Sequence, residues 1–233
     1  MNRRVLVTGG SRGIGLATAR LLRDRGWLVA IVARSPADLA AWESESGLDH
    51  PAVSGDVTDY RSVEAAVVRL AERWGGLDAL VCAAGTGSFG PTESLPLEAW
   101  HSQIDVNLTG TFHACRAVLP GMLAQGHGHL LNVLSVASVR AFPQSAGYVA
   151  SKWGAYGLTL GLAEEFRGRG IRVTALLPGS TDTPFWDSLG GAPFSKSDML
   201  SAEQVAQAAL WSLESPAGVS VDEIRILPPK GIL

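Results

Sequence analysis

The most constraining feature of the sequence is a repeated alternation between short apolar runs and longer segments with helical periodicity. The apolar runs occupy residues 3–8, 27–33, 52–54, 77–84, 128–135, 171–177 and 219–227. The segments between them repeat apolar residues at three- and four-residue spacing, as amphipathic helices do. Strands that are apolar throughout and separated by such helices are typical of a parallel sheet covered on both faces. The sequence therefore predicts the α/β class, with one doubly wound domain and about seven parallel strands.

Several local signals predict where helices begin. Ser35-Pro36 is typical of an N-cap followed by a first-turn proline, and Asp59 can cap a helix that follows it. Ser201 and Gln204 have the spacing of a capping box, which opens a helix to about residue 214. Residues 97–125 are expected to form one long helical stretch, in one or two pieces, and residues 146–167 another.

Composition limits the class of protein further. The 233 residues correspond to one large domain or two small ones, and because the alternation never breaks we expect a single domain over residues 1–233. The net charge of −3 argues against a nucleic-acid partner. The longest apolar run, residues 27–33, is far shorter than the roughly 20 residues of a membrane-spanning helix, so no membrane segment is expected. Two cysteines in apolar sequence, Cys82 and Cys115, predict a reduced, cytoplasmic protein without a disulfide.

A glycine-rich turn follows the first apolar run, in residues 8–15, Thr-Gly-Gly-Ser-Arg-Gly-Ile-Gly. Residues without a β-carbon let a backbone pass close to a pyrophosphate, and the N–H groups of the helix that follows can then face the anion. A glycine-rich turn also occurs in ordinary tight strand–helix connections. Its position at the first strand–helix junction favours dinucleotide binding.

The end of the second run bears on which dinucleotide is bound. An acidic residue there would hydrogen-bond the adenosine ribose and indicate NAD. The run ends instead in Ala33-Arg34, and Arg12 lies in the glycine turn. Two guanidinium groups suit a 2′-phosphate, so we expect NADP(H). The alternative is that Arg34 is a solvated loop residue.

A tyrosine and a lysine lie four residues apart, at Tyr148 and Lys152, and therefore share one face of the predicted helix. A nearby ammonium group and an oxidised nicotinamide both favour the phenolate, so we expect the pKa of Tyr148 to be lowered towards the range needed for proton transfer. Ser135 ends the preceding strand and could hold a substrate oxygen against the Tyr148 hydroxyl. Asn107, an unusual residue within a helical run, is either an exposed polar residue or the holder of a water that links Lys152 to solvent.

Together these motifs resemble the short-chain dehydrogenase/reductase family over nearly the whole chain. The resemblance implies a Rossmann-type fold and a catalytic tetrad of Asn107, Ser135, Tyr148 and Lys152, with Tyr148 as the acid/base. It also implies that Asp56 lies at the adenine and that Thr183 bonds the nicotinamide carboxamide. The full set of residues expected at the cofactor is Thr8, Gly9, Ser11, Arg12, Gly13, Ile14, Gly15, Ala33, Arg34, Asp56, Val57, Ala83, Ala84, Gly85, Tyr148, Lys152, Pro178, Gly179, Thr181 and Thr183.

Three departures from the family pattern carry expectations. Residues 82–85 are Cys-Ala-Ala-Gly where the family usually has Asn-Asn-Ala-Gly, so we expect lower local stability at Cys82. Residues 184–200 correspond to the region that closes over the substrate in this family, and their shortness predicts an open pocket or a small lid. The altered C-terminal tail, residues 224–230, leaves a homodimer as plausible as a homotetramer. Trp153 and Tyr156 are candidates for a helix–helix contact between subunits.

An apolar set of residues is expected to line the substrate pocket: Phe89, Ser135, Val136, Phe142, Phe185 and Trp186. Arg140 could bind a carboxylate there if it turned inward, and Arg140 and Lys196 are the only basic residues expected near the pocket mouth. His127 and His129 lack a nearby carboxylate in the sequence and are interpreted as a turn before a strand, with no metal site.

The function expected from this pattern is an NADPH-dependent carbonyl reductase or alcohol dehydrogenase acting on a small-molecule ketone or aldehyde. Within that class, 3-oxoacyl, small hydroxy-acid or amino-alcohol, and xenobiotic carbonyl substrates remain open. The alternatives are an NADP(H)-sensing regulatory protein on the same fold without turnover, and an epimerase or dehydratase. The shortness of the C-terminal region argues against the last of these.

Overall fold

The computed structural model describes residues 2–192, 194–216 and 218–231, and within them seven strands form one parallel sheet in the order β3-β2-β1-β4-β5-β6-β9. The strands are β1 (Arg4–Thr8), β2 (Leu28–Ala33), β3 (Ala52–Ser54), β4 (Ala79–Cys82), β5 (Gly128–Val133), β6 (Ile171–Pro178) and β9 (Glu223–Ile226). All six pairings are parallel. The expected doubly wound sheet of about seven strands is therefore confirmed.

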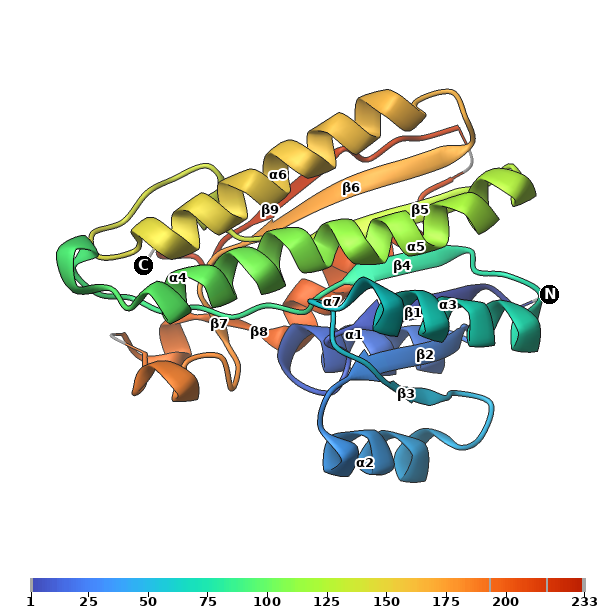
Figure 1. Ribbon diagram of the computed structural model, residues 1–233, viewed down its shortest axis with the longest axis horizontal. Coiled ribbons are helices and arrows are strands. Elements are labelled where there is room, and N and C mark those ends of the chain that lie inside the picture. The colour runs from blue at the N-terminus through green and yellow to red at the C-terminus, as the bar shows by residue number, and fades with distance from the viewer. Residues whose placement is uncertain (1, 193, 217, 232–233) are drawn as a thin grey trace.

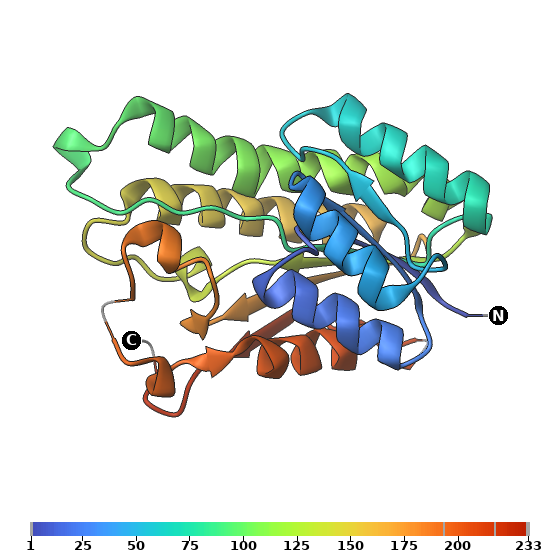
Figure 2. The ribbon, with the colours of Figure 1, turned by 90° about the horizontal axis from the view of Figure 1, so that it is seen from below.

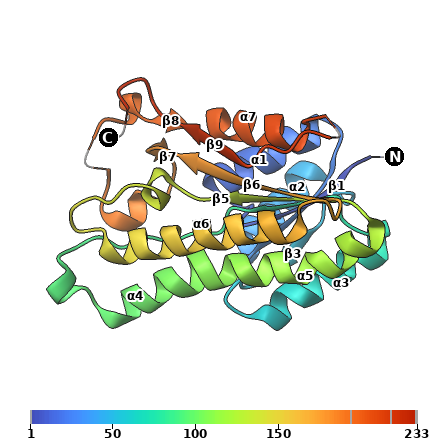
Figure 3. The same cartoon turned by 90° about the horizontal axis from the view of Figure 1, so that it is seen from above.

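Helices cover both faces of the sheet (Figures 1 and 2). One face carries α1 (Gly13–Asp24), α2 (Pro36–Ser46) and α7 (Ala202–Leu213), and the other α3 (Tyr60–Trp74), α4 (Leu97–Ile104), α5 (Gly110–Gln125) and α6 (Ala146–Phe166). Figure 3 shows these two helical layers with the sheet between them. Each layer packs on its own apolar core: Leu22, Trp42 and Leu210 lie in one, Leu70, Met122 and Phe166 in the other.

The predicted helix starts agree with the structure. Ser35 accepts a hydrogen bond from the Asp38 backbone N–H, and Asp59 accepts one from the N–H of Arg61. The capping box at Ser201 and Gln204 has both of its hydrogen bonds. These caps satisfy donors that the first turn of a helix otherwise leaves unpaired, so the chain enters each helix at a defined residue.

The structure differs from the sequence expectations mainly in irregular segments. The stretch 97–125 is two helices joined by a π-helical turn, Asp105–Thr109. A two-stranded sheet of β7 (Thr181–Asp182) and β8 (Leu200–Ser201) brackets the segment expected to be a lid. Such short strands have too few residues to show a two-residue periodicity. No helix among the described residues is long and apolar enough to cross a membrane.

At the opposite end of the sheet from the carboxyl ends of the strands, a partly buried ion pair joins β1 to the start of β4. Arg4 donates to Asp78 from Nε at 2.8 Å and from Nη2 at 2.7 Å, and its backbone N–H donates to the same carboxylate at 2.7 Å. The Nε2 atom of His127 lies 3.0 Å from Oδ1 of Asp78. Burial of the carboxylate opposes ionisation, but the hydrogen bonds from Arg4 and His127 outweigh it and lower the pKa of Asp78 to about 2.

We expect Asp78→Asn to lower the free energy of unfolding at pH 7 by about 2 kcal/mol. Because the folded-state pKa of Asp78 lies below its unfolded value of about 3.9, its contribution is present above pH 4 and is lost as the pH falls towards 2. Urea unfolding of both proteins at pH 7 and pH 3 measures this difference, which should roughly halve at pH 3. A difference that stays constant between the two pH values would contradict the assignment.

Candidate active site

A cavity of about 970 Å³ opens at the carboxyl ends of the strands, where β1 and β4 lie side by side. The chain after β1 leads to α1 on one face of the sheet, and the chain after β4 leads to α4 and α5 on the other. Ligands of open α/β sheets bind at this point in the strand order. Among the expected cofactor residues, the cavity is lined by Gly9, Ser11, Arg12, Gly13, Ile14, Ala33, Arg34, Asp56, Val57, Ala83, Ala84, Gly85, Tyr148, Lys152, Pro178, Gly179, Thr181 and Thr183. All six expected substrate-pocket residues line it as well. Three expected site residues, Thr8, Gly15 and Asn107, are not part of the lining.

The glycines of the turn between β1 and α1 are required in part by contacts within the chain. A β-carbon at Gly15 would lie 2.2 Å from the carbonyl oxygen of Gly9, and one at Gly9 would lie 2.6 Å from the Cα of Ala84. Gly9 and Gly13 also have positive φ angles of 65° and 54°. Gly15 therefore lets α1 pack tightly onto β1, a role that the sequence analysis had assigned to contact with the cofactor.

The start of α1 fits an anionic group. Arg12 occupies the N-cap position without making a side-chain cap, and the first turn holds no acidic residue. The backbone N–H groups of that turn, beginning at Gly13, therefore lack side-chain acceptors at a point where the helix dipole also favours negative charge. A dinucleotide pyrophosphate supplies the acceptors that this turn lacks.

The corner beyond the ends of β1 and β2 contains two arginines and two carboxylates. The side chain of Arg34 is 73% exposed and lies 3.9 Å from Asp56. Asp38 also lines the cavity there and accepts a hydrogen bond from Ser11 at 3.3 Å. Asp38 was not among the residues predicted from the sequence, although it lies in the first turn of α2, three residues after the N-cap Ser35. This carboxylate partly offsets the positive charge of Arg12 and Arg34.

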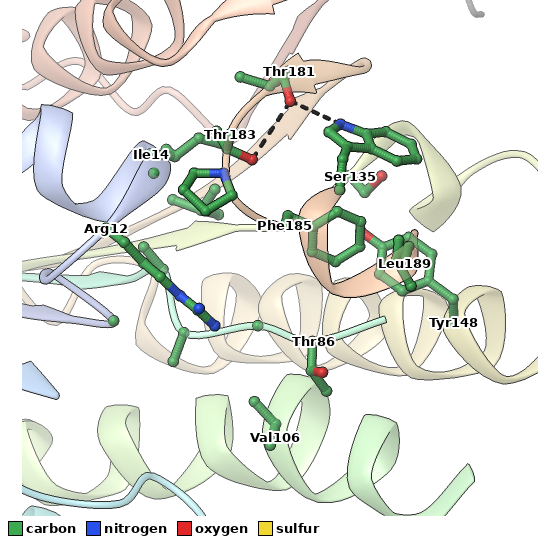
Figure 4. Close-up of a pocket in the computed structure, with 18 of the residues that line it drawn as sticks. Arg12, Ile14, Thr86, Val106, Ser135, Tyr148, Thr181, Thr183, Phe185 and Leu189 are labelled. Carbon is green, nitrogen blue, oxygen red and sulfur yellow. Dashed lines mark hydrogen bonds between the residues drawn. The ribbon is translucent and has the colours of Figure 1, made fainter. Parts of the chain in front are cut away.

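Tyr148 and Lys152 project from the first turns of α6, and Figure 4 shows Tyr148 and Arg12 on opposite sides of the cavity. Burial raises the pKa of Tyr148 to about 12, and hydrogen bonding with Ser135 acts in the opposite direction. Burial lowers the pKa of Lys152 to about 8. Its Nζ atom donates to the carbonyl of Val133 at 3.4 Å and lies 5.9 Å from the centre of the Tyr148 ring. In the protein alone, the pKa of Tyr148 is thus raised and not lowered, because burial outweighs hydrogen bonding with Ser135.

Asn107 lies in the π-helical turn, and all of its amide hydrogen-bonding groups have protein partners. Its Oδ1 accepts from the N–H of Thr86 at 2.9 Å, and its Nδ2 donates to the carbonyl of Thr86 at 2.8 Å and to Ser151 at 2.9 Å. The side chain is 1% exposed. The interpretation as an exposed polar residue is therefore wrong, and the amide fastens the chain after β4.

Cys82 is buried at the end of β4 beside Cys115 of α5, and both thiols are free. Hydrogen bonding with Cys115 and burial raise the pKa of Cys82 well above its usual value. The Cys115 thiol donates to Oδ1 of Asn132 at 3.7 Å, and Nδ2 of Asn132 donates to Thr159 Oγ1 at 2.9 Å. This chain of contacts occupies the place where the family motif has an amide.

Other candidate residues lie outside the cavity. Arg140 is exposed, and Lys196 pairs with Asp182 at 3.0 Å; neither lines the cavity. Trp153 is 50% exposed on α6, but Tyr156 donates its hydroxyl to Glu223 of the same chain. The ring of His129 is buried and bonds Thr174 at 2.8 Å.

Residues 3–192 match the family model described as short chain dehydrogenase. The chain belongs to the short-chain dehydrogenase family. An uncharacterized oxidoreductase of Staphylococcus saprophyticus is 34% identical over 227 residues, which cover 96% of each chain. This curated relative and others at similar identity are named as oxidoreductases.

Two solved structures of short-chain dehydrogenase folds are similar over almost their whole length. An alcohol dehydrogenase from Thermococcus sibiricus, complexed with 5-hydroxy-NADP, has a TM-score of 0.87 and 32% identity, covering 97% of this chain and 96% of that one. The closed form of a serine dehydrogenase complexed with NADP⁺ has a TM-score of 0.93 and 28% identity, covering 99% and 96%. The short-chain dehydrogenase described here is an oxidoreductase with the same fold.

Proposed function

We propose that this oxidoreductase uses NADP(H) to interconvert a ketone or aldehyde with the corresponding alcohol, with Tyr148 as the acid/base. The observation that carries the proposal is one cavity that joins two features. An uncapped helix start with Arg12 beside it lies at one end, and Tyr148 with Ser135 beside it lies at the other. The NADP-bound relatives support the choice of cofactor.

The residues that would hold the cofactor follow from the lining of the cavity. The first turn of α1 would hold the pyrophosphate, Arg12 and Arg34 the 2′-phosphate, and Asp56 and Val57 the adenine. Thr183, Pro178 and Gly179 also line the cavity and would hold the nicotinamide. The bound nicotinamide supplies a hydride, and the protein supplies binding, orientation and proton transfer.

Tyr148 is suited to give a proton to a substrate oxygen. With a pKa of about 12 in the protein alone, its hydroxyl keeps its proton at neutral pH, which is the state that a general acid requires. Ser135 hydrogen-bonds Tyr148 and can hold the same oxygen. Lys152 places a cation close to the Tyr148 ring and stabilises the phenolate after the proton has left. Holding these groups together reduces the entropic part of the barrier.

An NADP(H) sensor without turnover is not favoured, because the relatives are oxidoreductases and a sensor has no need of the Tyr148–Lys152 pair. The function is tested by following NADPH oxidation at 340 nm over a panel of ketones, aldehydes and 3-oxoacyl thioesters. Oxidation that depends on both the protein and the carbonyl supports the proposal. If NADPH binds tightly but is not oxidised with any member of the panel, the NADP(H) sensor becomes the favoured function.

Cofactor choice is tested at the end of β2. We expect Ala33→Asp combined with Arg34→Ala to shift the ratio of NADPH to NADH affinity towards NADH by at least about tenfold, because an arginine is replaced by a ribose-binding carboxylate. Fluorescence titration with each cofactor measures the ratio. Arg61→Ala, which removes an arginine outside the cavity lining, should leave it unchanged. An unmoved ratio in the double variant would show that Arg34 does not select the cofactor.

A further inference from the structure

The substrate end of the cavity is built from a series of aromatic rings. The ring of Phe89 lies 5.4 Å from the Tyr148 ring and meets it edge to face, and the ring of Phe185 lies 5.8 Å from it on a tilt of 48°. The ring centres of Phe185 and Trp186 lie 5.5 Å apart, and those of Trp186 and Phe194 lie 5.3 Å apart. We call Phe89, Phe185, Trp186 and Phe194 the aromatic cluster. Aromatic pairs at these separations and angles attract one another beyond simple area burial.

The aromatic cluster is placed where a substrate has to approach Tyr148. Figure 4 shows the Phe185 ring beside the Tyr148 ring, and a β-carbon at Gly87 would lie 2.5 Å from the tip of the Phe185 ring. The ring therefore lies tightly between the Gly87 backbone and Tyr148. Trp186 is fixed by a hydrogen bond of 2.9 Å from its Nε1 to the carbonyl of Thr181. Phe89 remains 39% exposed, so a ligand can bury more of it.

The aromatic cluster carries no charge, and the cation beside Tyr148, Lys152, is buried. Among the described lining residues the ionisable side chains are Arg12, Arg34, Asp38, Asp56, Tyr148 and Lys152. Arg12, Arg34 and Asp56 follow β1, β2 and β3, and Asp38 lies in the first turn of α2. Lys152 is 5% exposed, and its Nζ lies against the Val133 carbonyl. A carboxylate or ammonium group that bound on the aromatic cluster would lose its hydration without a direct ion-pair partner there, which is strongly unfavourable.

We infer that the substrate is an uncharged carbonyl compound with an aromatic substituent, which binds on the aromatic cluster with Phe185 as the residue that selects it. This inference rests on the proposed function. A substrate that binds beside Tyr148 would displace the Phe185 ring from its contacts with Tyr148 and Gly87. A substrate ring replaces those contacts, whereas a small keto acid or a polar amino alcohol does not. Among the substrate classes left open by the sequence, the inference favours the neutral xenobiotic-type ketone.

The first test is binding, with NADPH present, of the matched pair benzamide and benzoate, which differ in charge but hardly in shape. Isothermal calorimetry should give at least tenfold tighter binding for benzamide. The second test is the ratio of kcat/KM for acetophenone to that for cyclohexyl methyl ketone, which has the same carbon framework without the aromatic ring. We expect this ratio to fall at least fivefold in Phe185→Leu, which keeps an apolar side chain but removes the ring.

The matched control is Phe112→Leu, the same substitution at a phenylalanine that is 41% exposed on α5 and does not line the cavity. It should leave the ratio unchanged. Equal binding of benzoate, faster Tyr148-dependent reduction of pyruvate than of acetophenone, or an unchanged ratio in Phe185→Leu would each overturn the inference while the reductase function stands. If instead no carbonyl is reduced but benzamide still binds more tightly than benzoate, the proposed function falls and the ligand class is retained.

Discussion

Replacing Tyr148 by Phe should lower kcat by at least about a thousandfold while changing the affinity for NADPH by less than about twofold. The change removes only the hydroxyl that gives its proton to the substrate oxygen, and general acid catalysis of this kind contributes roughly 10²–10⁴-fold. The ring contacts with Phe89 and Phe185 do not need the hydroxyl and are kept. Steady-state turnover of the best carbonyl substrate, together with NADPH fluorescence titration, measures the two effects.

Tyr156→Phe is the matched control for this experiment. Tyr156 lies two turns further along α6, is outside the cavity lining, and uses its hydroxyl to bond Glu223. Its loss should leave kcat within about twofold, because exposed hydrogen bonds of this kind contribute little. Turnover that survives in the Tyr148 variant would assign the proton to another donor, and an equal loss in both variants would indicate damage to α6 and not to the chemistry.

Gly15→Ala should lower the free energy of unfolding by about 3 kcal/mol and weaken NADPH binding at least about tenfold. The added methyl group would lie 2.2 Å from the Gly9 carbonyl oxygen, a backbone atom that cannot rotate away, and 3.2 Å from Ala83. Helix α1 must therefore move off β1, and the first-turn N–H groups move with it. Urea unfolding and fluorescence titration of NADPH report the two losses separately.

Gly161→Ala supplies the comparison within the same chain. Gly161 is an exposed residue of α6, and nothing lies within 4 Å of the position that its β-carbon would take. Alanine is the better helix former, so this variant should be as stable as the original or more stable by up to about 1 kcal/mol. A Gly15→Ala protein that binds NADPH normally would mean that α1 can shift without disturbing the cavity.

The sheet and its helices could be predicted from the sequence because each element carries its own local signal. Strands such as residues 128–133 are buried on both faces, and the caps at Ser35, Asp59 and Ser201 mark helix starts within one residue. The expected lining of the cavity was also largely recovered, because parallel strands bring the residues after their carboxyl ends to one edge.

What could not be predicted depends on contacts between distant segments. Asp38 reaches the cofactor corner only because α2 turns back beside the glycine turn, and the pKa of Tyr148 depends on burial that spacing along the chain does not express. The need for glycine at position 15 likewise comes from the carbonyl of Gly9, six residues earlier. The stacking of Phe185 on Tyr148 joins residues 37 positions apart in a segment without regular periodicity.

The side chain of Asn107 has a consequence for how the sheet ends. Its amide accepts from the N–H of Thr86 and donates to the carbonyl of the same residue, which is how a peptide group on an adjacent strand would pair with it. One side chain thus imitates a neighbouring strand at a place where β4 has already ended. The segment after β4 is aligned like part of the sheet, and among the described residues no strand pairs with its other edge, which leaves that edge open to a ligand.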